Sequence, residues 1–270
     1  MNDLEESNRQ FIDAWEMYAR RAENGFIREC DGIAVAFCGV AMPLMNMVFL
    51  TSPVADAADL DRRLELAHEI CRASERSWIF TLCDDWLPAA LHARAPAVLA
   101  AAGMAPVSTT TGMVADELAR PRRSPPPELA IRPVDSEAAR RLVADLNTAA
   151  HQMPTAWGYE ALAREELFGA DVWGEVGYVG DTAVSTSTTA LVDRRLYVMM
   201  VATAAGQTQK GYAEAVIRQS LARAIAKTGL RRTVLHATVA GQPLYASMGY
   251  RATSRFTMYM TGAEHGTRPA

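Results

Sequence analysis

A short polar loop between an apolar strand and a long helix holds the residues best suited to bind an anion. The sequence reads VATAAGQTQKGYA over 201–213. The first backbone N–H groups of a helix have no partner within the helix, and the helix dipole favours a negative charge beside them. Because Gly211 and Ala213 carry so little side chain, a diphosphate could approach the amides of 209–213 closely. The loop therefore fits either a diphosphate site or a plain turn at the start of a helix, and it matches neither common glycine-rich phosphate motif.

A tyrosine near the C-terminus is the second candidate. Residues 242–250 read QPLYASMGY, and Pro243 suits the first turn of a helix. The proline would fix the direction of Tyr245, whose phenol can donate a proton or a hydrogen bond. The alternative is that the ring packs in the core and the hydroxyl makes a structural hydrogen bond.

Three further side chains could hold or move a proton. The ordinary pKa of a histidine lies near neutral pH, so His236 could act as a base. A single histidine on a short strand also fits a structural role in the core. Glu175 lies in an alternating strand and could face a cleft or the solvent, and His151 lies in a loop between two predicted helices. No metal site is expected, because the cysteines form no C-x-x-C pair and have no nearby histidine pattern. They are predicted to be free buried thiols: Cys30, Cys38, Cys71 and Cys83.

Periodicity and turn residues predict alternating strands and helices in two halves. The C-terminal half has predicted strands at 129–133, 173–179, 182–191, 195–203, 233–237 and 251–260, and helices at 136–150, 159–168, 211–227 and 242–248. The N-terminal half has predicted helices at 5–23, 57–74 and 89–102, and strands at 26–30, 33–40, 45–50, 78–82 and 106–115. Three consecutive prolines cannot continue a helix, so ARPRRSPPP reads as a linker. We therefore expect domains at 1–118 and 128–262, a linker at 119–127 and a flexible tail at 263–270.

Composition excludes several classes of protein. The 270 residues include 27 Lys and Arg against 31 Asp and Glu, a net charge of −4, so no basic excess points to nucleic acid. The uncharged stretch 32–55 is long enough for a membrane span, but Pro43 and Asn46 interrupt it, so a buried hairpin is expected. The polar N-terminus does not resemble a signal peptide. These features predict a cytoplasmic protein with no nucleic-acid or membrane partner.

Together the motifs of the C-terminal half resemble the GNAT family of acyl-CoA-dependent N-acyltransferases. The stretch VATAAGQTQKGYA looks like the acetyl-CoA motif of that family, and LYASMGY looks like its closing element, with one long helix and one strand between them. In the N-terminal half, residues 99–113 align with residues 245–259, which suggests a duplication. The resemblance implies an α/β fold of two tandem GNAT-like domains, each a mixed, mostly antiparallel sheet flanked by helices. It also implies acetyl-CoA as cosubstrate and an amine as acceptor.

The resemblance carries over residue by residue. It implies that acetyl-CoA contacts the end of a strand, the loop, the helix start and one position on the next strand: Val201, Ala202, Thr203, Thr208, Gln209, Lys210, Gly211, Tyr212, Ala213 and Thr238. Tyr245 falls on the tyrosine acid of the family, and His151 falls in its acceptor-binding loop, with Glu175 as a weaker substrate candidate. The sequence departs from the family at Thr208, where Arg or Gln is usual, and at Thr238, where Asn is frequent. Strand 196–203 also lacks the glutamate that many members use as a base, so the base is a water relay or an unassigned group.

The N-terminal half has the element order of the family but not its loop. Asp56 and Asp59 stand where a phosphate would lie, which predicts a degenerate copy that completes the acceptor cleft or an oligomer interface; a homodimer is a possible assembly. The departures above keep a second interpretation open, a non-catalytic acyl-CoA-binding or regulatory protein. The sequence leaves the acceptor open among small-molecule amines, amino acids, antibiotics and protein N-termini.

Overall fold

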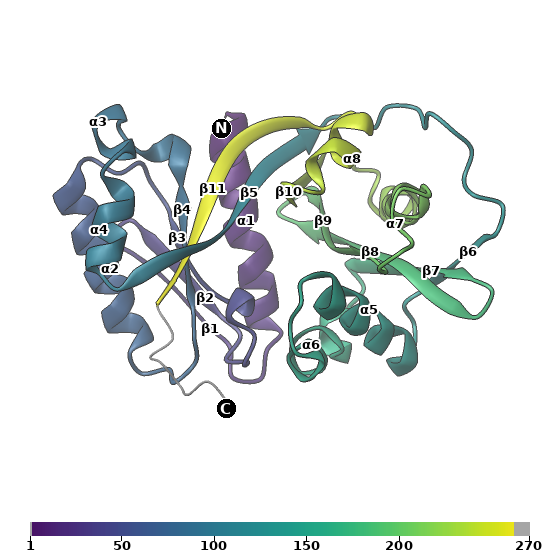
Figure 1. Ribbon diagram of the computed structural model, residues 1–270, viewed down its shortest axis with the longest axis horizontal. Coiled ribbons are helices and arrows are strands. Elements are labelled where there is room, and N and C mark those ends of the chain that lie inside the picture. Colours follow the sequence, from purple (N-terminus) through teal and green to yellow (C-terminus); the bar gives the residue numbers. More distant parts are fainter. Residues whose placement is uncertain (1, 262–270) are drawn as a thin grey trace.

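One sheet of 11 strands runs from end to end of the molecule (Figure 1). The computed structural model describes residues 2–261, and the predicted tail at 263–270 lies outside them. The strand order is β1-β2-β3-β4-β11-β5-β10-β9-β8-β7-β6. Neighbouring strands are antiparallel except for two parallel pairs, β3 with β4 and β9 with β10. Each half therefore contributes one parallel pair, as expected for a duplicated α/β unit.

The N-terminal half follows the predicted element order. Its elements are α1 (Asp3–Arg20), β1 (Phe26–Cys30), β2 (Ile33–Phe37), β3 (Asn46–Leu50), α2 (Ala57–Cys71), β4 (Ile79–Cys83), α3 (Ala89–His92), α4 (Ala95–Ala101) and β5 (Met104–Ala115). The strands β2 and β3 form the expected buried antiparallel hairpin. The single helix predicted at 89–102 is wrong: it divides into α3 and α4, because Pro96 suits the first turn of a new helix but not the interior of a longer one.

The C-terminal half begins with an additional edge strand. Its elements are β6 (Leu129–Pro133), α5 (Glu137–Ala150), α6 (Thr155–Leu162), β7 (Val172–Val179), β8 (Thr182–Val192), β9 (Arg195–Thr203), α7 (Tyr212–Thr228), β10 (Thr233–Thr238), α8 (Gln242–Ser247) and β11 (Arg251–Thr261). The helix predicted at 159–168 is wrong in position. Helix α6 starts directly after Pro154, and a separate 3-10 turn follows at Glu165–Leu167. A proline at a helix start was the missed signal.

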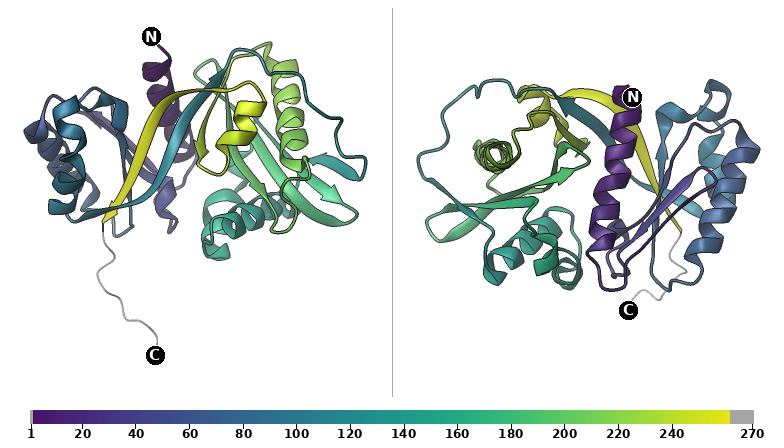
Figure 2. Two further views of the ribbon diagram at one scale, coloured as in Figure 1. Left: turned by 45° about the horizontal axis from the view of Figure 1, so that its top comes forward. Right: turned by 180° about the vertical axis from the view of Figure 1, so that it is seen from behind.

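The two halves exchange their last strands. Strand β5 pairs with β10 of the C-terminal half, and β11 pairs with β4 of the N-terminal half, while β5 and β11 pair with each other along the middle of the sheet. In Figure 2 these two long strands cross from one half to the other. The halves therefore share a continuous hydrogen-bonded ladder, so neither can unfold without breaking backbone hydrogen bonds of the other.

Helix α1 lies between the halves and packs on strands of both (Figures 1 and 2). Its Phe11 is fully buried between β3 and β11, with its ring 5.2 Å from those of Phe49 and Phe256. A large apolar core spans both halves on this face. A smaller core lies under α7 and α8 and includes Leu196, Ile217 and Tyr245. The N-terminal helix thus belongs structurally to both halves.

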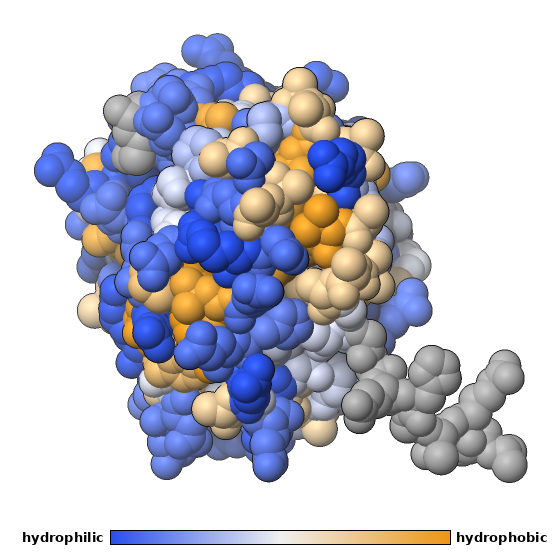
Figure 3. Space-filling view, turned by 90° about the vertical axis from the view of Figure 1, so that its left-hand side faces the viewer, coloured by the Kyte–Doolittle hydropathy of each residue, from blue (hydrophilic) through white to orange (hydrophobic). Residues whose placement is uncertain are grey.

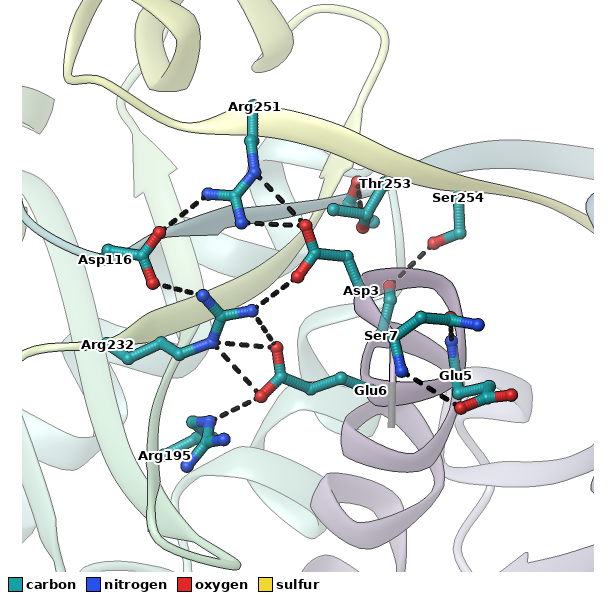
Figure 4. Close-up of polar contacts among 12 residues, drawn as sticks. Asp3, Glu5, Glu6, Ser7, Asp116, Arg195, Arg232, Arg251, Thr253 and Ser254 are labelled. Carbon is teal, nitrogen blue, oxygen red and sulfur yellow. Dashed lines mark hydrogen bonds and ion pairs between the residues drawn. The ribbon is translucent and has the colours of Figure 1, made fainter.

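A cluster of charged side chains, the clasp, fastens the start of α1 to the central strands (Figure 4). It consists of Asp3, Glu6, Asp116, Arg195, Arg232 and Arg251. Glu6 is only 4% exposed and lies 2.5 Å from Arg195 Nε, while Arg232 contacts Asp3, Glu6 and Asp116. Burial alone would raise the pKa of Glu6, but hydrogen bonds from Arg232 and Arg195 lower it below its usual range. Glu6 therefore stays ionised at neutral pH.

The outer face of the N-terminal half carries short apolar side chains among charged ones (Figure 3). Exposed alanines of α3 and α4 lie on this side, among them Ala89, Ala90 and Ala97. Within residues 2–261, every helix is too short or too polar to span a bilayer.

Candidate active site

The site is built where strands β9 and β10 separate. They pair only at Leu196 with Thr233 and at Tyr197 with Val234. Beyond that point β9 contains a bulge, since Met200 and Val201 both face the single residue Ser187 of β8. Met200 adopts a left-handed conformation, with a φ of 49°. Bulges redirect the backbone and are common beside active sites, so this one turns the amides of β9 away from the ladder at the opening between the strands.

Helix α5 holds the bulge in place. The amide of Asn147 donates to the carbonyls of Val143 and of Met200, at 2.8 and 3.3 Å. From the other half, the hydroxyl of Tyr18 donates to the sulfur of Met199 at 2.8 Å. Met200 itself is only half-buried. The bulge is therefore supported from both halves while one of its side chains stays accessible.

The loop after β9 ends in an open helix N-terminus. Gly211 precedes α7 with a φ of 87°, a conformation that favours glycine, and no side chain caps the helix. The first bond into the helix runs from the amide of Ala215 to Gly211 O, at 3.2 Å. Within the described residues, the amides of Tyr212, Ala213 and Glu214 have no acceptor. These free donors and the helix dipole form a cradle that suits a diphosphate.

The predicted phosphate contacts lie around this cradle. Val201, Ala202 and Thr203 form the end of β9, while Thr208, Gln209 and Lys210 are exposed in the loop. Lys210 Nζ donates to Gln207 at 2.8 Å and lies 6.0 Å from the centre of the Tyr212 ring. Ala213 is half-buried in the first helical turn, beside the cradle.

Two predicted contacts are engaged with other parts of the chain. The hydroxyl of Tyr212 donates to Glu128 at the end of the linker, at 2.7 Å. Thr238 lies at the exposed end of β10, across the opening from β9, and its hydroxyl accepts from the amide of Gly241 at 3.3 Å.

Tyr245 lies on α8, on the face of the sheet covered by α7. It is 8% exposed, and its ring meets that of Tyr250 edge to face at 5.7 Å. Burial raises its pKa above the ordinary value, so the phenol stays protonated. Its hydroxyl makes no hydrogen bond with the residues described. The ring therefore packs in the smaller core, as the alternative role expects, while the structural hydrogen bond of that role is not seen among the described residues.

His236 is half-buried, and both of its ring nitrogens are engaged with hydroxyl groups of the chain. Its Nδ1 lies 2.7 Å from the Tyr197 hydroxyl and its Nε2 lies 3.2 Å from that of Ser7, which is 2.6 Å from Ser254. Phe11 stacks on the imidazole at 3.8 Å. Burial lowers the pKa of His236 to about 3, so the ring stays neutral at neutral pH. The core role that the sequence left open describes this histidine.

The two weaker substrate candidates lie in different environments. Glu175 is 1% exposed and its carboxylate is 2.5 Å from Arg223 of α7. Its side chain therefore faces α7, away from α5 and the predicted acceptor loop, and this position does not support the predicted contact with substrate. His151 follows α5 and is exposed. The loop before β3 also reaches the C-terminal half, where the amide of Ala41 donates to Glu160 of α6 at 2.9 Å.

The corresponding helix start in the N-terminal half is closed. Asp56 caps α2 by accepting from the amide of Asp59 at 2.9 Å, and Asp59 accepts from the amide of Ala55 at 3.1 Å. Arg63 lies 2.7 Å from Asp59 and donates to the carbonyls of Gly32, Ser52 and Pro53. Carboxylates of the chain itself occupy the positions that an anionic ligand would take.

The role of α1 was missed by sequence reasoning. Ser7 and Tyr18 of this helix contact His236 and Met199 of the C-terminal half. Their spacing on an amphipathic helix predicts burial, but nothing in the sequence indicates which half they face. Gly112 of β5 hints at the contact, because a side chain there would collide with the hydroxyls of Ser7 and Ser254.

Comparison with known proteins identifies the fold. No protein-family model matches the sequence, and no curated protein matches it. A GCN5-related N-acetyltransferase from Kribbella flavida is similar in structure, with a TM-score of 0.70, 15% identity and 96% of each chain covered. A GCN5-related N-acetyltransferase-like protein from Streptococcus suis gives 0.53 and 15%, covering 95% of this chain and 98% of the other.

A tandem GNAT protein from the clavulanic acid biosynthesis pathway is also similar. Its TM-score is 0.51 with 13% identity, and 98% of this chain and 96% of that chain are covered. The predicted resemblance is thus confirmed at the level of the fold. The chain has the α/β fold of the GCN5-related N-acetyltransferases, in a tandem arrangement.

Proposed function

We propose that the protein is an acyl-CoA-dependent N-acetyltransferase that moves an acetyl group from acetyl-CoA to a primary amine. The observation that carries this proposal is the uncapped start of α7 beside the bulge of β9. The free amides of Tyr212, Ala213 and Glu214 are suited to the diphosphate, because each can donate a hydrogen bond to an anionic oxygen. Val201, Ala202 and Thr203 then line the path of the acyl chain along β9.

Attack of the amine on the thioester carbonyl places negative charge on the carbonyl oxygen. A backbone amide at the end of β9 would donate to that oxygen, and such preorganised donors are the main source of stabilisation in acyl transfer. The nitrogen–carbon bond forms as the carbon–sulfur bond breaks, and Tyr245 protonates the departing sulfur. Burial raises the pKa of Tyr245, so the phenol is protonated at neutral pH and donates a hydrogen bond to the departing sulfur. Because a thiolate is a weaker base than this phenolate, the proton moves to the sulfur only as the proton released by the amine replaces it on the phenol.

The acceptor would approach from the side of α5 and α6, where His151 is exposed. We assign no side chain as the base. His236 is unsuited to that role, since its pKa of about 3 and its two hydrogen-bond partners leave it a poor acceptor. Deprotonation by water is consistent with the absence of a carboxylate from β9, which reads RLYVMMVAT.

The experiment is an acetyl-transfer assay with a panel of amines, in which release of the CoA thiol is measured. Acetylation of any amine above the uncatalysed rate supports the enzyme. Binding of CoA without transfer to any amine would instead favour the non-catalytic acyl-CoA-binding protein.

The diphosphate cradle is tested by Gly211→Asp. The substitution places a negative charge beside the amides and a side chain at a φ of 87°, so we expect at least a tenfold weaker affinity for acetyl-CoA by calorimetry. Gly229→Asp is the matched control, because Gly229 has a φ of 72° at the opposite end of the same helix. Equal affinity of Gly211→Asp and wild type would contradict the cradle.

A further inference from the structure

The linker between the halves ends against the diphosphate cradle. A side chain added at Gly211 would lie 3.6 Å from the ring of Pro126. The hydroxyl of Tyr212 donates a hydrogen bond to the carboxylate of Glu128, the last residue before β6. Lys210 lies close enough to Glu128 to help lower the pKa of its carboxyl, after the larger effect of the hydrogen bond from Tyr212. The end of the linker therefore forms part of the surface around the first turn of α7.

The other end of the linker is also anchored. The amide of Ala119 donates to the carbonyl of Met248 at the end of α8, at 2.8 Å, and Ala119 packs directly on Gly249. Between these anchors the linker arches past α7 (Figure 1). Because the chain is held at both ends, residues 120–125 are tethered on the side of the molecule that α7 occupies.

Three arginines lie on this held segment: Arg120, Arg122 and Arg123. All three are exposed, and within residues 2–261 none makes an ion pair or a side-chain hydrogen bond. In a chain with a net charge of −4, three unpaired arginines within four residues form a concentrated positive charge. Such a charge attracts a polyanion that binds beside it.

The distances along the chain bring two of these arginines within reach of the cradle. Three residues of polyproline geometry span about 9 Å, so Arg123 lies within about that distance of Pro126, whose ring would touch a side chain added at Gly211. The consecutive prolines 125–127 stiffen the path. A diphosphate held at the start of α7 would therefore have guanidinium groups beside the part of the ligand that projects toward the solvent.

Resting on the proposed function, we infer that the linker forms one side of the coenzyme site, beside β9 and the start of α7. We infer that Arg122 and Arg123 of this linker bind the 3′-phosphate of CoA. Arginine suits this role because its guanidinium pairs with phosphate oxygens through two parallel N–H groups. The linker would then have two tasks, since it connects the halves and selects a 3′-phosphorylated ligand. Ligands that share the diphosphate but lack the 3′-phosphate would bind more weakly.

The test compares CoA with 3′-dephospho-CoA, which keeps the diphosphate, by calorimetry on the full chain. We expect Arg122→Gln/Arg123→Gln to weaken CoA binding by roughly tenfold or more, because two charge-assisted contacts are lost at an exposed site. Binding of 3′-dephospho-CoA should change less than about threefold. The matched control is Arg28→Gln/Arg94→Gln, which removes two exposed, unpaired arginines from the N-terminal half and should leave both affinities unchanged.

The outcomes separate this inference from the proposed function. Equal losses for the two ligands, no loss, or a gain in affinity would overturn the role of the arginines, and a gain would mean that the linker covers the cradle. In each of these cases wild-type binding of CoA leaves the proposed function standing. A wild-type chain that binds neither ligand would overturn both.

Discussion

Helices α2 and α7 follow the first strand of each parallel pair, yet their N-termini are satisfied in opposite ways. At α2, Asp56 and Asp59 accept hydrogen bonds from backbone amides, and Arg63 neutralises Asp59. At α7, Gly211 leaves the first-turn amides free. The same fold thus yields a self-capped helix in one half and an open anion cradle in the other. A few side chains at the helix start decide whether a duplicated unit can bind a ligand.

The same contrast appears at the helix before the last strand of each half. Tyr245 of α8 aligns with Leu99 of α4, which is fully buried. The N-terminal half therefore lacks both the cradle and the phenol. Its remaining contribution to the site is structural support from α1, whose Tyr18 donates a hydrogen bond to the sulfur of Met199 beside the bulge of β9. One half has lost the binding groups and serves to support the other.

The largest expected effect is on turnover, when Tyr245 loses its hydroxyl and so becomes more like Leu99, the residue with which it aligns. Tyr245→Phe keeps the ring and its packing but removes the proton donor. We expect turnover to fall by about 10²–10⁴-fold, with acetyl-CoA affinity and melting temperature nearly unchanged. Tyr259→Phe, at a buried tyrosine of β11, is the matched control and should retain wild-type turnover. Unchanged turnover for Tyr245→Phe rules out its role as the acid, and a large fall in melting temperature indicates a structural hydroxyl.

The next effect concerns the clasp that joins the halves. Arg232→Ala leaves buried Glu6 with Arg195 as its remaining partner in the clasp, and breaking a buried pair from one side costs about 3 kcal/mol. Urea unfolding measures the loss, and Arg141→Ala, at an exposed ion pair with Glu137, should cost less than about 1 kcal/mol. Because the halves exchange strands, one cooperative transition is expected for both variants. Two separate transitions would show that the halves fold independently.

The smallest effect tests the self-capped helix. Burial acts to raise the pKa of Asp59, but hydrogen bonds from Arg63 and from the amide of Ala55 lower it to about 2, against an ordinary value of 3.8. A lowered pKa in the folded state stabilises the protein above about pH 4, and this stabilisation is lost as the pH falls toward 2. Asp59→Asn should therefore cost about 1 kcal/mol at pH 7, and its melting temperature should converge with that of wild type below pH 4. A constant difference across this range would contradict the ionic role of Asp59.

The sequence predicted the order of elements well, because strands and helices of this protein have clear periodicity and turn residues. It located the cradle through Gly211 and the self-capped loop through Asp56 and Asp59. It did not predict the exchange of β5 and β11, since the residues of a strand do not specify which of two similar edges it pairs with. The position of Glu175 was missed for a related reason: both faces of β7 are covered, so alternation does not reveal which face holds the acceptor.

The measurement that tests the central contrast most directly is the stoichiometry of CoA binding to the full chain. Calorimetric titration should give one CoA per chain, and Gly211→Asp should weaken that single site, because only α7 offers free amides among the helix starts compared here. A stoichiometry of two would show that the carboxylates at α2 do not close the N-terminal half. No binding at all would show that the open cradle at α7 is not a coenzyme site.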